Sequence, residues 1–156
     1  MAEDITVREE AADSLIAVRL VDAMVTEMEQ LYSLPAGSGL GTGAPPSDFT
    51  PPSGAFLVIY RGGKPVAGGG LKRDDDGVAE IKRMYVAPES RREGLGRRLL
   101  EELEEKAREL GYARIRLDTG ARQPHARAMY ERAGYHPIDN YNGNRQASFW
   151  GEKILR

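Results

Sequence analysis

The sequence predicts an α/β fold, in which one domain has a mixed central β-sheet flanked by helices. Three observations predict it. The chain has 156 residues, about the size of one domain with one hydrophobic core. Its N-terminal half contains apolar runs joined by short turns, which indicate an antiparallel meander. Its C-terminal half alternates helical and strand-like segments, which favours parallel strands.

The chain begins with a short strand and a helix. Ile5–Arg8 alternates in polarity and predicts the first strand. From Asp13 onward apolar residues recur at helical spacing, which predicts one amphipathic helix. The apolar stripe of this helix consists of Leu15, Val18, Val21, Met24, Val25, Met28 and Leu31.

A loop rich in Gly and Pro follows over residues 33–54, "SLPAGSGLGTGAPPSDFTPPSG". A loop of this length in a small domain is typically functional or disordered, so we expect a mobile flap. Its "GSGLGTG" is similar to a dinucleotide-binding fingerprint, but that motif needs a helix directly after it. Pro45 and Pro46 stand there instead. We therefore reject a nucleotide site in this loop.

Three strands are predicted next. "AFLVIY" (55–60) is a continuous apolar run, "PVAGGGLK" (65–72) follows the turn "RGGK", and "VAEIKRMYVA" (78–87) follows the turn "DDDG". Hairpin turns between consecutive strands predict an antiparallel meander. The three glycines in the middle strand indicate a bulge or a close backbone approach.

The pattern changes after Gly94. Leucines and alanines at helical spacing predict a helix over 95–110 that ends at Gly111. "ARIRLDT" (113–119) is then a strand parallel to 78–87, because a helix connects the two. Pro124 begins another helix, in which Ala126, Met129, Tyr130 and Ala133 share a face. "YHPID" and "QASFWGEKIL" predict a final hairpin around "NYNGN".

Composition excludes several classes of function. The absence of cysteine excludes disulfides and thiolate zinc sites, and His125 and His136 have no ligand-like spacing, so we expect no metal. A net charge of −2 argues against nucleic-acid binding. No apolar run approaches the ~20 residues of a membrane span, and the acidic start "MAEDITVREE" is unlike a signal peptide. We expect a cytoplasmic protein without a membrane partner.

The stretch "RREGLGRRLL" (91–100) carries the first functional signal. It lies in a region, residues 79–98, with six basic and three acidic residues, which favours a small anionic ligand. Gly94 and Gly96 stand between a strand and a helix, where unpaired N–H groups at the positive end of the helix bind phosphate. A P-loop needs Lys-Ser or Lys-Thr after its last glycine, whereas Arg97-Arg98 follows here. The stretch is therefore either a plain turn or a pyrophosphate site without a magnesium-binding hydroxyl.

Two motifs together resemble the GNAT superfamily of N-acetyltransferases. "MYVAPESRREGLGRRLL" (84–100) matches its strand followed by [Arg/Gln]-x-x-Gly-x-[Gly/Ala]. "LDTGARQPHARAMYERAGY" (117–135) matches its later A-x-x-x-Tyr-Glu-x-x-Gly-[Phe/Tyr] signature. The resemblance implies the GNAT fold over nearly the whole chain, with parallel central strands that splay apart. It also implies direct transfer of an acetyl group from acetyl-CoA to a primary amine of a small molecule or peptide.

The resemblance implies site residues position by position. Tyr130 lies where many members have the acid that protonates the departing thiolate. Glu80 lies where the histone-acetylating branch has its general base. Gln123 stands where the family more often has Asn, and it keeps an amide. The residues implied to bind the cofactor are Met84, Tyr85, Val86, Arg91, Arg92, Glu93, Gly94, Leu95, Gly96, Arg97 and Gln123.

Each assignment has a structural alternative. Strand alternation puts Val78, Glu80, Lys82, Met84 and Val86 on one face, so Glu80 could simply pair with Lys82. The ring of Tyr130 could be core packing. From topology alone, four residues near the long loop and the final hairpin are candidates for an acceptor pocket. These are Tyr32, Asp48, Tyr141 and Asn142.

Two functions of different class follow. One is an N-acetyltransferase, and the other is a non-catalytic acyl-CoA-binding sensor on the same fold. Both require acetyl-CoA, and a homodimer is compatible with either. The enzyme alone needs an acid or a base, so the presence of both Glu80 and Tyr130 favours it.

Overall fold

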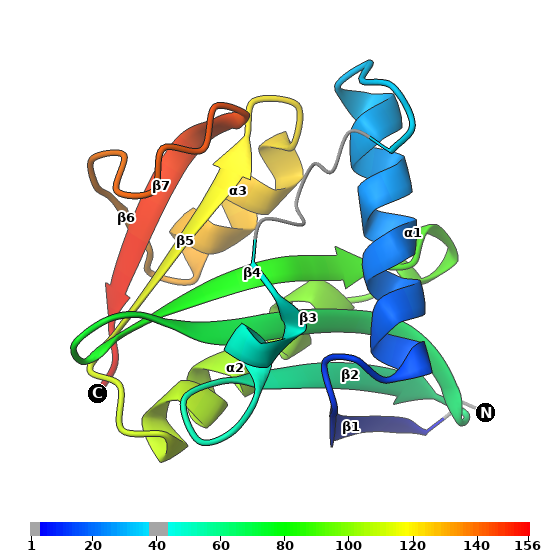
Figure 1. Ribbon diagram of the computed structural model, residues 1–156, viewed down its shortest axis with the longest axis horizontal. Coiled ribbons are helices and arrows are strands. Elements are labelled where there is room, and N and C mark those ends of the chain that lie inside the picture. Colours follow the sequence, from blue (N-terminus) through cyan, green and yellow to red (C-terminus); the bar gives the residue numbers. More distant parts are fainter. Residues whose placement is uncertain (1–3, 38–43) are drawn as a thin grey trace.

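The computed structural model describes residues 4–37 and 44–156. Its strands form one seven-stranded sheet in the order β1-β2-β3-β4-β5-β7-β6 (Figure 1). The strands are β1 (Ile5–Glu10), β2 (Ala55–Arg61), β3 (Lys64–Asp75), β4 (Val78–Val86), β5 (Arg114–Gly120), β6 (His136–Pro137) and β7 (Ala147–Ile154). The helices are α1 (Leu15–Leu31), α2 (Leu95–Glu109) and α3 (Pro124–Arg132), with short 3-10 turns η1 (Pro46–Phe49) and η2 (Pro88–Ser90).

The predicted architecture is confirmed. Strands β1 to β4 pair antiparallel in chain order, β4 and β5 are parallel, and β6 and β7 form the final hairpin. The main differences are in length, since β1 and β3 extend further than predicted and β6 is only two residues long. Most of the "GSGLGTG" stretch, residues 38–43, lies outside the described residues, and the mobility of the 33–54 loop stays a prediction.

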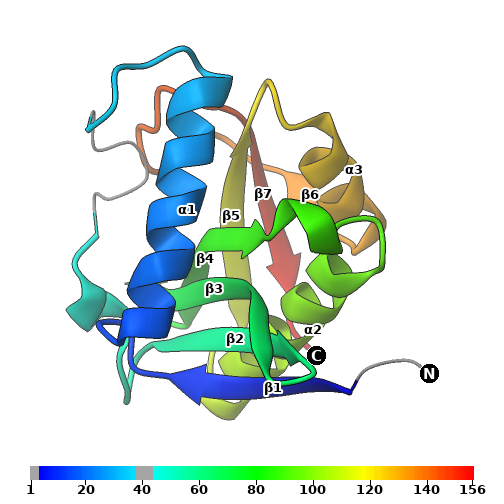
Figure 2. The same ribbon diagram turned by 90° about the vertical axis from the view of Figure 1, so that its right-hand side faces the viewer.

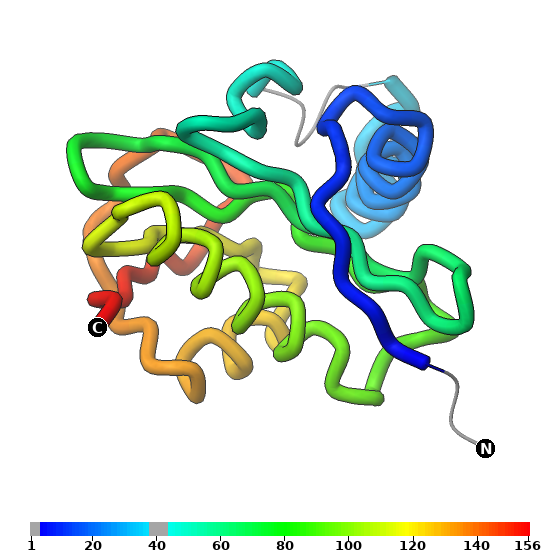
Figure 3. Tube along the Cα trace, turned by 90° about the horizontal axis from the view of Figure 1, so that it is seen from below, coloured from blue at the N-terminus to red at the C-terminus, as the bar shows by residue number. Residues whose placement is uncertain are grey.

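Helices cover both faces of the sheet. Figures 2 and 3 show α1 on one face and α2 and α3 on the other. Four residues of the predicted α2 stripe, Leu95, Leu99, Leu103 and Ala107, are buried in the larger core, which also contains Tyr130 and Tyr135, and the fifth, Leu110, is partly buried against it. A smaller core beneath α1 contains Ala17, Leu20, Phe49 and Phe56. In the described residues, no helix combines the length and apolar character that a membrane span requires.

A β-bulge in β4 overturns one prediction. Gly68 pairs with Tyr85 and Gly70 with Lys82, so two β4 residues stand opposite Gly69. The first of them, Arg83, has a φ of 60°, in the left-handed region that a non-glycine residue adopts only at a cost. The extra residue reverses the side-chain alternation of the strand. Glu80 and Lys82 therefore face α1, whereas Met84 and Val86 pack into the larger core on the opposite face.

The glycines of β3 allow close approach, as predicted. A Cβ at Gly70 would lie 2.5 Å from the ring of Phe49, and one at Gly69 would lie 3.1 Å from Met84. Gly68 is equally crowded, because its Cβ would lie 2.9 Å from Leu20. Larger residues here would push away both the segment 46–49 and the bulge.

The two parallel strands separate after a short contact. Their pairing begins at Val78 with Arg114 and ends at Glu80 with Arg116, although β4 continues to Val86 and β5 to Gly120. Each strand keeps its other neighbour, β3 or β7, along this stretch. Figure 1 shows the two strands diverging from this point. The separation leaves main-chain groups of both strands available to a ligand.

Candidate active site

The loop before α2 has the backbone geometry of an anion site. Arg92 and Gly94 both have positive φ, 66° and 81°, and the helix begins at Leu95. Gly94 is the N-cap residue, and no side chain caps the helix there. The first N–H groups of a helix have no partner within the helix, so those of α2 remain available at its positive end. This fifteen-residue helix can therefore hold a phosphate group.

Most of the arginines around this loop pair with protein groups, whereas the side chain of Arg92 forms no ion pair with the described residues. Arg91 donates from Nε to the carbonyl of Val86 at 2.9 Å and pairs with Glu27 of α1 at 2.7 Å, and its guanidinium lies over the ring of Tyr85. The other ion pairs here are Arg97–Glu101, Arg98–Glu102 and Arg61–Glu93. The backbone amides at the start of α2 are therefore better placed to bind an anion than the paired arginines are.

The loop, the end of β4 and α3 meet at Gly96. A Cβ there would contact the sulfur of Met129 at 3.4 Å and Val86 at 3.8 Å, so little room remains for a larger side chain. At the far end of the separated strands, Gln123 closes the turn after β5. Its Oε1 accepts the N–H of Gly120 at 3.2 Å. The predicted cofactor residues are thus distributed along both edges of the separation.

Tyr130 is a residue of α3, and its side chain contacts the bulge of β4. It is 6% exposed, and its hydroxyl contacts the sulfur of Met84 at 3.7 Å. Its ring packs edge-on against Tyr135, with centroids 6.0 Å apart. Burial raises the pKa of the Tyr130 hydroxyl well above its usual value, and the charge of Asp118 raises it further. The phenol therefore keeps its proton at neutral pH, and its one hydrogen-bond partner among residues 4–37 and 44–156 is a weak acceptor.

Glu80 is the centre of a polar cluster on the α1 face. Glu80 is 2% exposed, and its carboxylate forms ion pairs with Lys72 at 3.7 Å and with Lys82 at 3.6 Å. The hydroxyl of Tyr141 donates to its Oε2 at 2.7 Å, and the amide of Asn142 donates to the same oxygen at 3.1 Å. The predicted alternative, a Glu80–Lys82 pair, is therefore present.

Two of the four proposed acceptor residues join this cluster. Tyr141 contacts Glu80, and burial followed by the Glu80 charge raises the pKa of its phenol. The amide of Asn142 also donates to Asp118, and its oxygen accepts the indole N–H of Trp150 at 3.0 Å. Asp118 and Trp150 were missed by sequence reasoning. Alternation from Arg116 along β5 could have indicated Asp118, whereas nothing local indicated Trp150.

The other two acceptor candidates lie elsewhere around the site. The hydroxyl of Tyr32 is buried and makes no hydrogen bond with the described residues. It lies over Gly120, where any Cβ would collide with it. Asp48 lies in η1 and interacts electrostatically with Arg83. Burial lowers the pKa of the Arg83 guanidinium, and the negative charge of Asp48 raises it. Tyr32 thus stands at the end of β5, and Asp48 stands on the side of the bulge.

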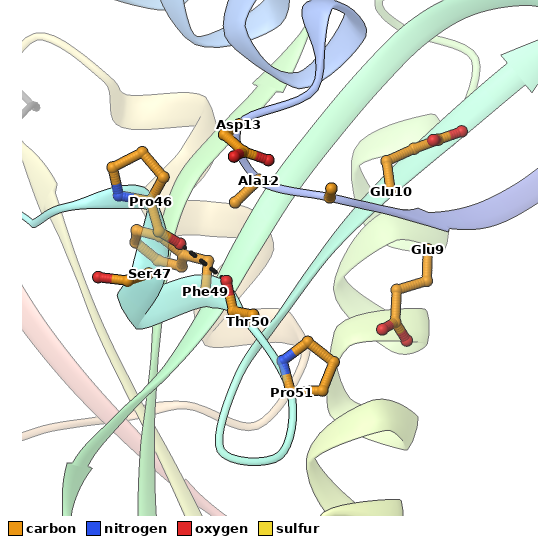
Figure 4. A pocket seen from close by; sticks show the side chains of 10 residues that line it. Glu9, Glu10, Ala12, Asp13, Pro46, Ser47, Phe49, Thr50 and Pro51 are labelled. Atoms are coloured by element: carbon orange, nitrogen blue, oxygen red, sulfur yellow. Dashed lines mark hydrogen bonds between the residues drawn. The ribbon is translucent and has the colours of Figure 1, made fainter.

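A pocket of about 490 Å³ lies beside η1, where both chain neighbours of Asp48 line it. Figure 4 shows Pro46, Phe49 and Pro51 on one wall and Ala12 and Asp13 on the other. None of the predicted site residues lines it. The candidate site is therefore the separation between β4 and β5. The described residues contain no group of His, Cys, Asp and Glu able to hold a metal ion.

Comparison with known proteins agrees with this geometry. The sequence model of the acetyltransferase (GNAT) family matches residues 25–135. The "IAA acetyltransferase" of Azospirillum brasilense is 31% identical over 133 residues, which cover 85% of this chain and 84% of that relative. The "Uncharacterized N-acetyltransferase YjgM" of Escherichia coli K12 is 32% identical over 124 residues, 74% of each chain.

Solved structures share the fold. An acetyltransferase of the GNAT family from Staphylococcus aureus matches with a TM-score of 0.81 and 15% identity, covering 98% of this chain and all of that one. The PaiA N-acetyltransferase of Thermoplasma acidophilum, solved in complex with coenzyme A, matches with a TM-score of 0.75 and 18% identity over 97% and 99% of the two chains. At these identities the likeness concerns the fold.

Proposed function

Because this chain belongs to the acetyltransferase (GNAT) family, we propose that it transfers the acetyl group of acetyl-CoA directly to a primary amine. One observation carries the proposal. The separation of β4 and β5 has an uncapped helix N-terminus near one end and the buried hydroxyl of Tyr130 beside the bulge. An anion site and a proton donor along one cleft are what an acyl-CoA thioester requires.

The cofactor residues have distinct roles in this proposal. The amides from Arg92 to Arg97 hold the pyrophosphate at the start of α2, and Gly94 supplies the left-handed turn. The main chain of β4 beyond Glu80, at Met84, Tyr85 and Val86, supplies hydrogen bonds to the pantetheine arm. Arg91 anchors the loop to α1 through Glu27, so its effect on binding is indirect.

The reaction requires two proton transfers, one to the departing sulfur and one from the attacking amine. The neutral amine attacks the thioester carbon, and the C–S bond of the resulting tetrahedral intermediate breaks. Tyr130 donates its proton to the departing sulfur and later regains one from water. The amine nitrogen loses a proton as it forms the amide. A positioned donor and a positioned acceptor each lower the barrier for such a transfer.

We propose Glu80 as the acceptor of the amine proton. Its carboxylate is almost fully buried and surrounded by Tyr141, Asn142 and two lysines. Direct contact with a substrate is therefore blocked, and a water molecule must carry the proton to it. The same contacts hold the 139–146 segment over the sheet, so Glu80 also positions Tyr141 and Asn142.

The first test is amine-dependent release of CoA. We expect purified protein with acetyl-CoA to release free thiol, detected with a thiol reagent, only when a suitable primary amine is added. Amino acids, alkylamines, polyamines and peptides cover the main classes of acceptor. Acetyl-CoA binding without thiol release from any of these amines would contradict the enzyme and favour the acyl-CoA sensor.

The second test concerns Glu80. We expect Glu80→Gln to lower kcat/KM by about 10²–10⁴-fold, because the proton acceptor is lost. The measurement is the steady-state kinetics of the purified variant with a basic amine. Glu104→Gln is the matched control, since Glu104 is a buried carboxylate that contacts Lys153 and the hydroxyl of Tyr135. It should cost stability and leave kcat/KM in place. An unchanged kcat/KM in Glu80→Gln means that Glu80 only positions its neighbours.

A further inference from the structure

Two opposite charges face each other where β4 and β5 separate. Glu80 and Arg116 form the last cross-strand pair, so both side chains lie on the α1 face. With a side-chain period of two, the next residues on this face are Lys82 on β4 and Asp118 on β5. The bulge at Arg83 comes after Lys82, so it does not change the face of the sheet on which Lys82 lies. Beyond the last cross-strand pair, the β4 side of the separation therefore presents the lysine Lys82, and the β5 side presents the carboxylate of Asp118.

One carboxylate oxygen of Asp118 accepts no hydrogen bond from the described residues. The amides of Asn142 and Asn144 both donate to its Oδ2. Within residues 4–37 and 44–156, no hydrogen bond reaches Oδ1, and no lysine or arginine forms an ion pair with this carboxylate. A carboxylate held rigidly through one oxygen presents the other to a cationic ligand.

The two lysines around Glu80, Lys82 on β4 and Lys72 on the neighbouring β3, outnumber its single negative charge. Lys82 and Lys72 share one carboxylate, Glu80, at 3.6 and 3.7 Å, which is longer than an N–H···O hydrogen bond. Lys72 also donates to the carbonyl of Arg73 at 3.1 Å. The side chain of Lys82 is 30% exposed, so its ammonium remains accessible to an anionic group. The separation between β4 and β5 thus has an accessible positive charge, Lys82, on one side and a negative charge, Asp118, on the other.

Resting on the acetyl transfer proposed above, we propose that the acceptor is a small amino acid. Its ammonium group binds Asp118, and its carboxylate binds Lys82. A zwitterion satisfies both charged edges at once, whereas a simple alkylamine leaves Lys82 unmatched. A polyamine brings a second cation towards Lys82 and Lys72, where like charges repel.

The Asp118 edge is connected to the proposed proton acceptor through the final loop. Asn142 donates to both Asp118 and Glu80, so the binding carboxylate and the proton acceptor belong to one network.

The experiment compares acceptors that differ in one group. Thiol release is measured with α-, β- and γ-amino acids, with their carboxamides, and with the amines left when the carboxylate is removed. We expect kcat/KM for the best amino acid to exceed that of its carboxamide by about 10-fold or more, the effect of one charge-assisted contact. A carboxamide or amine that is used as well as the acid overturns the inference and leaves acetyl transfer standing.

Two variants assign the contacts. Lys82→Gln should reduce the preference for acid over carboxamide to near unity, and Lys64→Gln on the exposed start of β3 should not change it. A disturbance passed through Glu80 affects both acceptors alike, so it cancels in this ratio. Asp118→Asn retains an oxygen for the amides of Asn142 and Asn144, and it should raise KM for the amino acid about 10-fold or more; the exposed Asp139→Asn is its control.

Three outcomes decide between the proposals. An unchanged preference in Lys82→Gln, or an unchanged KM in Asp118→Asn, overturns the amino-acid inference. Thiol release from amines that lack a carboxylate, with no preference for acids, does the same while the transferase stands. No thiol release with any acceptor overturns both.

Discussion

Replacing Tyr130 with phenylalanine is expected to lower kcat by about 100-fold or more, because the departing thiolate loses its proton donor. The affinity for acetyl-CoA and the melting temperature should remain nearly unchanged. The melting temperature should change little because, among the described residues, the hydroxyl bonds only to the sulfur of Met84, a weak acceptor, at 3.7 Å. The ring, which packs against Tyr135, is retained. Steady-state kinetics and thermal melts measure the two effects separately.

Tyr135→Phe is the matched control, since the two tyrosines are neighbours in one core. The hydroxyl of Tyr135 donates to buried Glu104 at 2.8 Å, so its removal should cost about 1–3 kcal/mol of stability and leave kcat in place. The raised pKa of Tyr130 adds a pH expectation: deprotonation of this phenol should not reduce kcat below about pH 10. Wild-type turnover in Tyr130→Phe would make the residue part of the core only.

A side chain at Gly94 is expected to weaken acetyl-CoA binding by about 100-fold or more, since it occupies the space where phosphate approaches several amides. Gly94→Asn is the sharpest change. Asparagine tolerates the left-handed conformation, in which Gly94 has a φ of 81°, and a Cβ there meets no atom within 4 Å. The fold should therefore remain intact. Calorimetric titration with acetyl-CoA gives the affinity.

Gly111→Asn controls for the backbone cost of this change. Gly111 lies just beyond the other end of α2, has a φ of 90°, and also has no neighbour within 4 Å of a Cβ. Both variants should melt at similar temperatures, and Gly111→Asn should bind acetyl-CoA normally. Equal affinity in the two variants would place the pyrophosphate elsewhere.

Local patterns in the sequence determined most of the fold. The α2 stripe of Leu95, Leu99, Leu103 and Ala107 follows from helical periodicity, and the meander follows from turn residues between apolar runs. The parallel pair β4–β5 follows from the helix between them. The glycine loop before α2 and the tyrosine of α3 were also found, because each belongs to a short contiguous motif.

The contacts of the candidate site could not be predicted in this way. Periodicity placed Glu80 and Met84 on one face, but one extra residue at the Arg83 bulge turned them to opposite faces. The glycines of β3 indicated a bulge or a close approach, but they did not tell which strand holds the extra residue or that it stands at Arg83, because this depends on the pairing of β3 with β4. Tyr32 was placed near the site on topology, yet its position over Gly120 required the packing of α1 across the sheet.

The sequence by itself therefore determined the order of the elements, the glycine loop before α2 and the position of Tyr130 in α3, because those depend on residues close together in the chain. Only the tertiary structure decided which charges meet at the opening. Lys72, Glu80, Asp118 and Asn142 come from four separate segments, and neighbouring strands and a hairpin loop bring them into one network. Electrostatic interactions depend on separation in space and on burial, and the fold sets both.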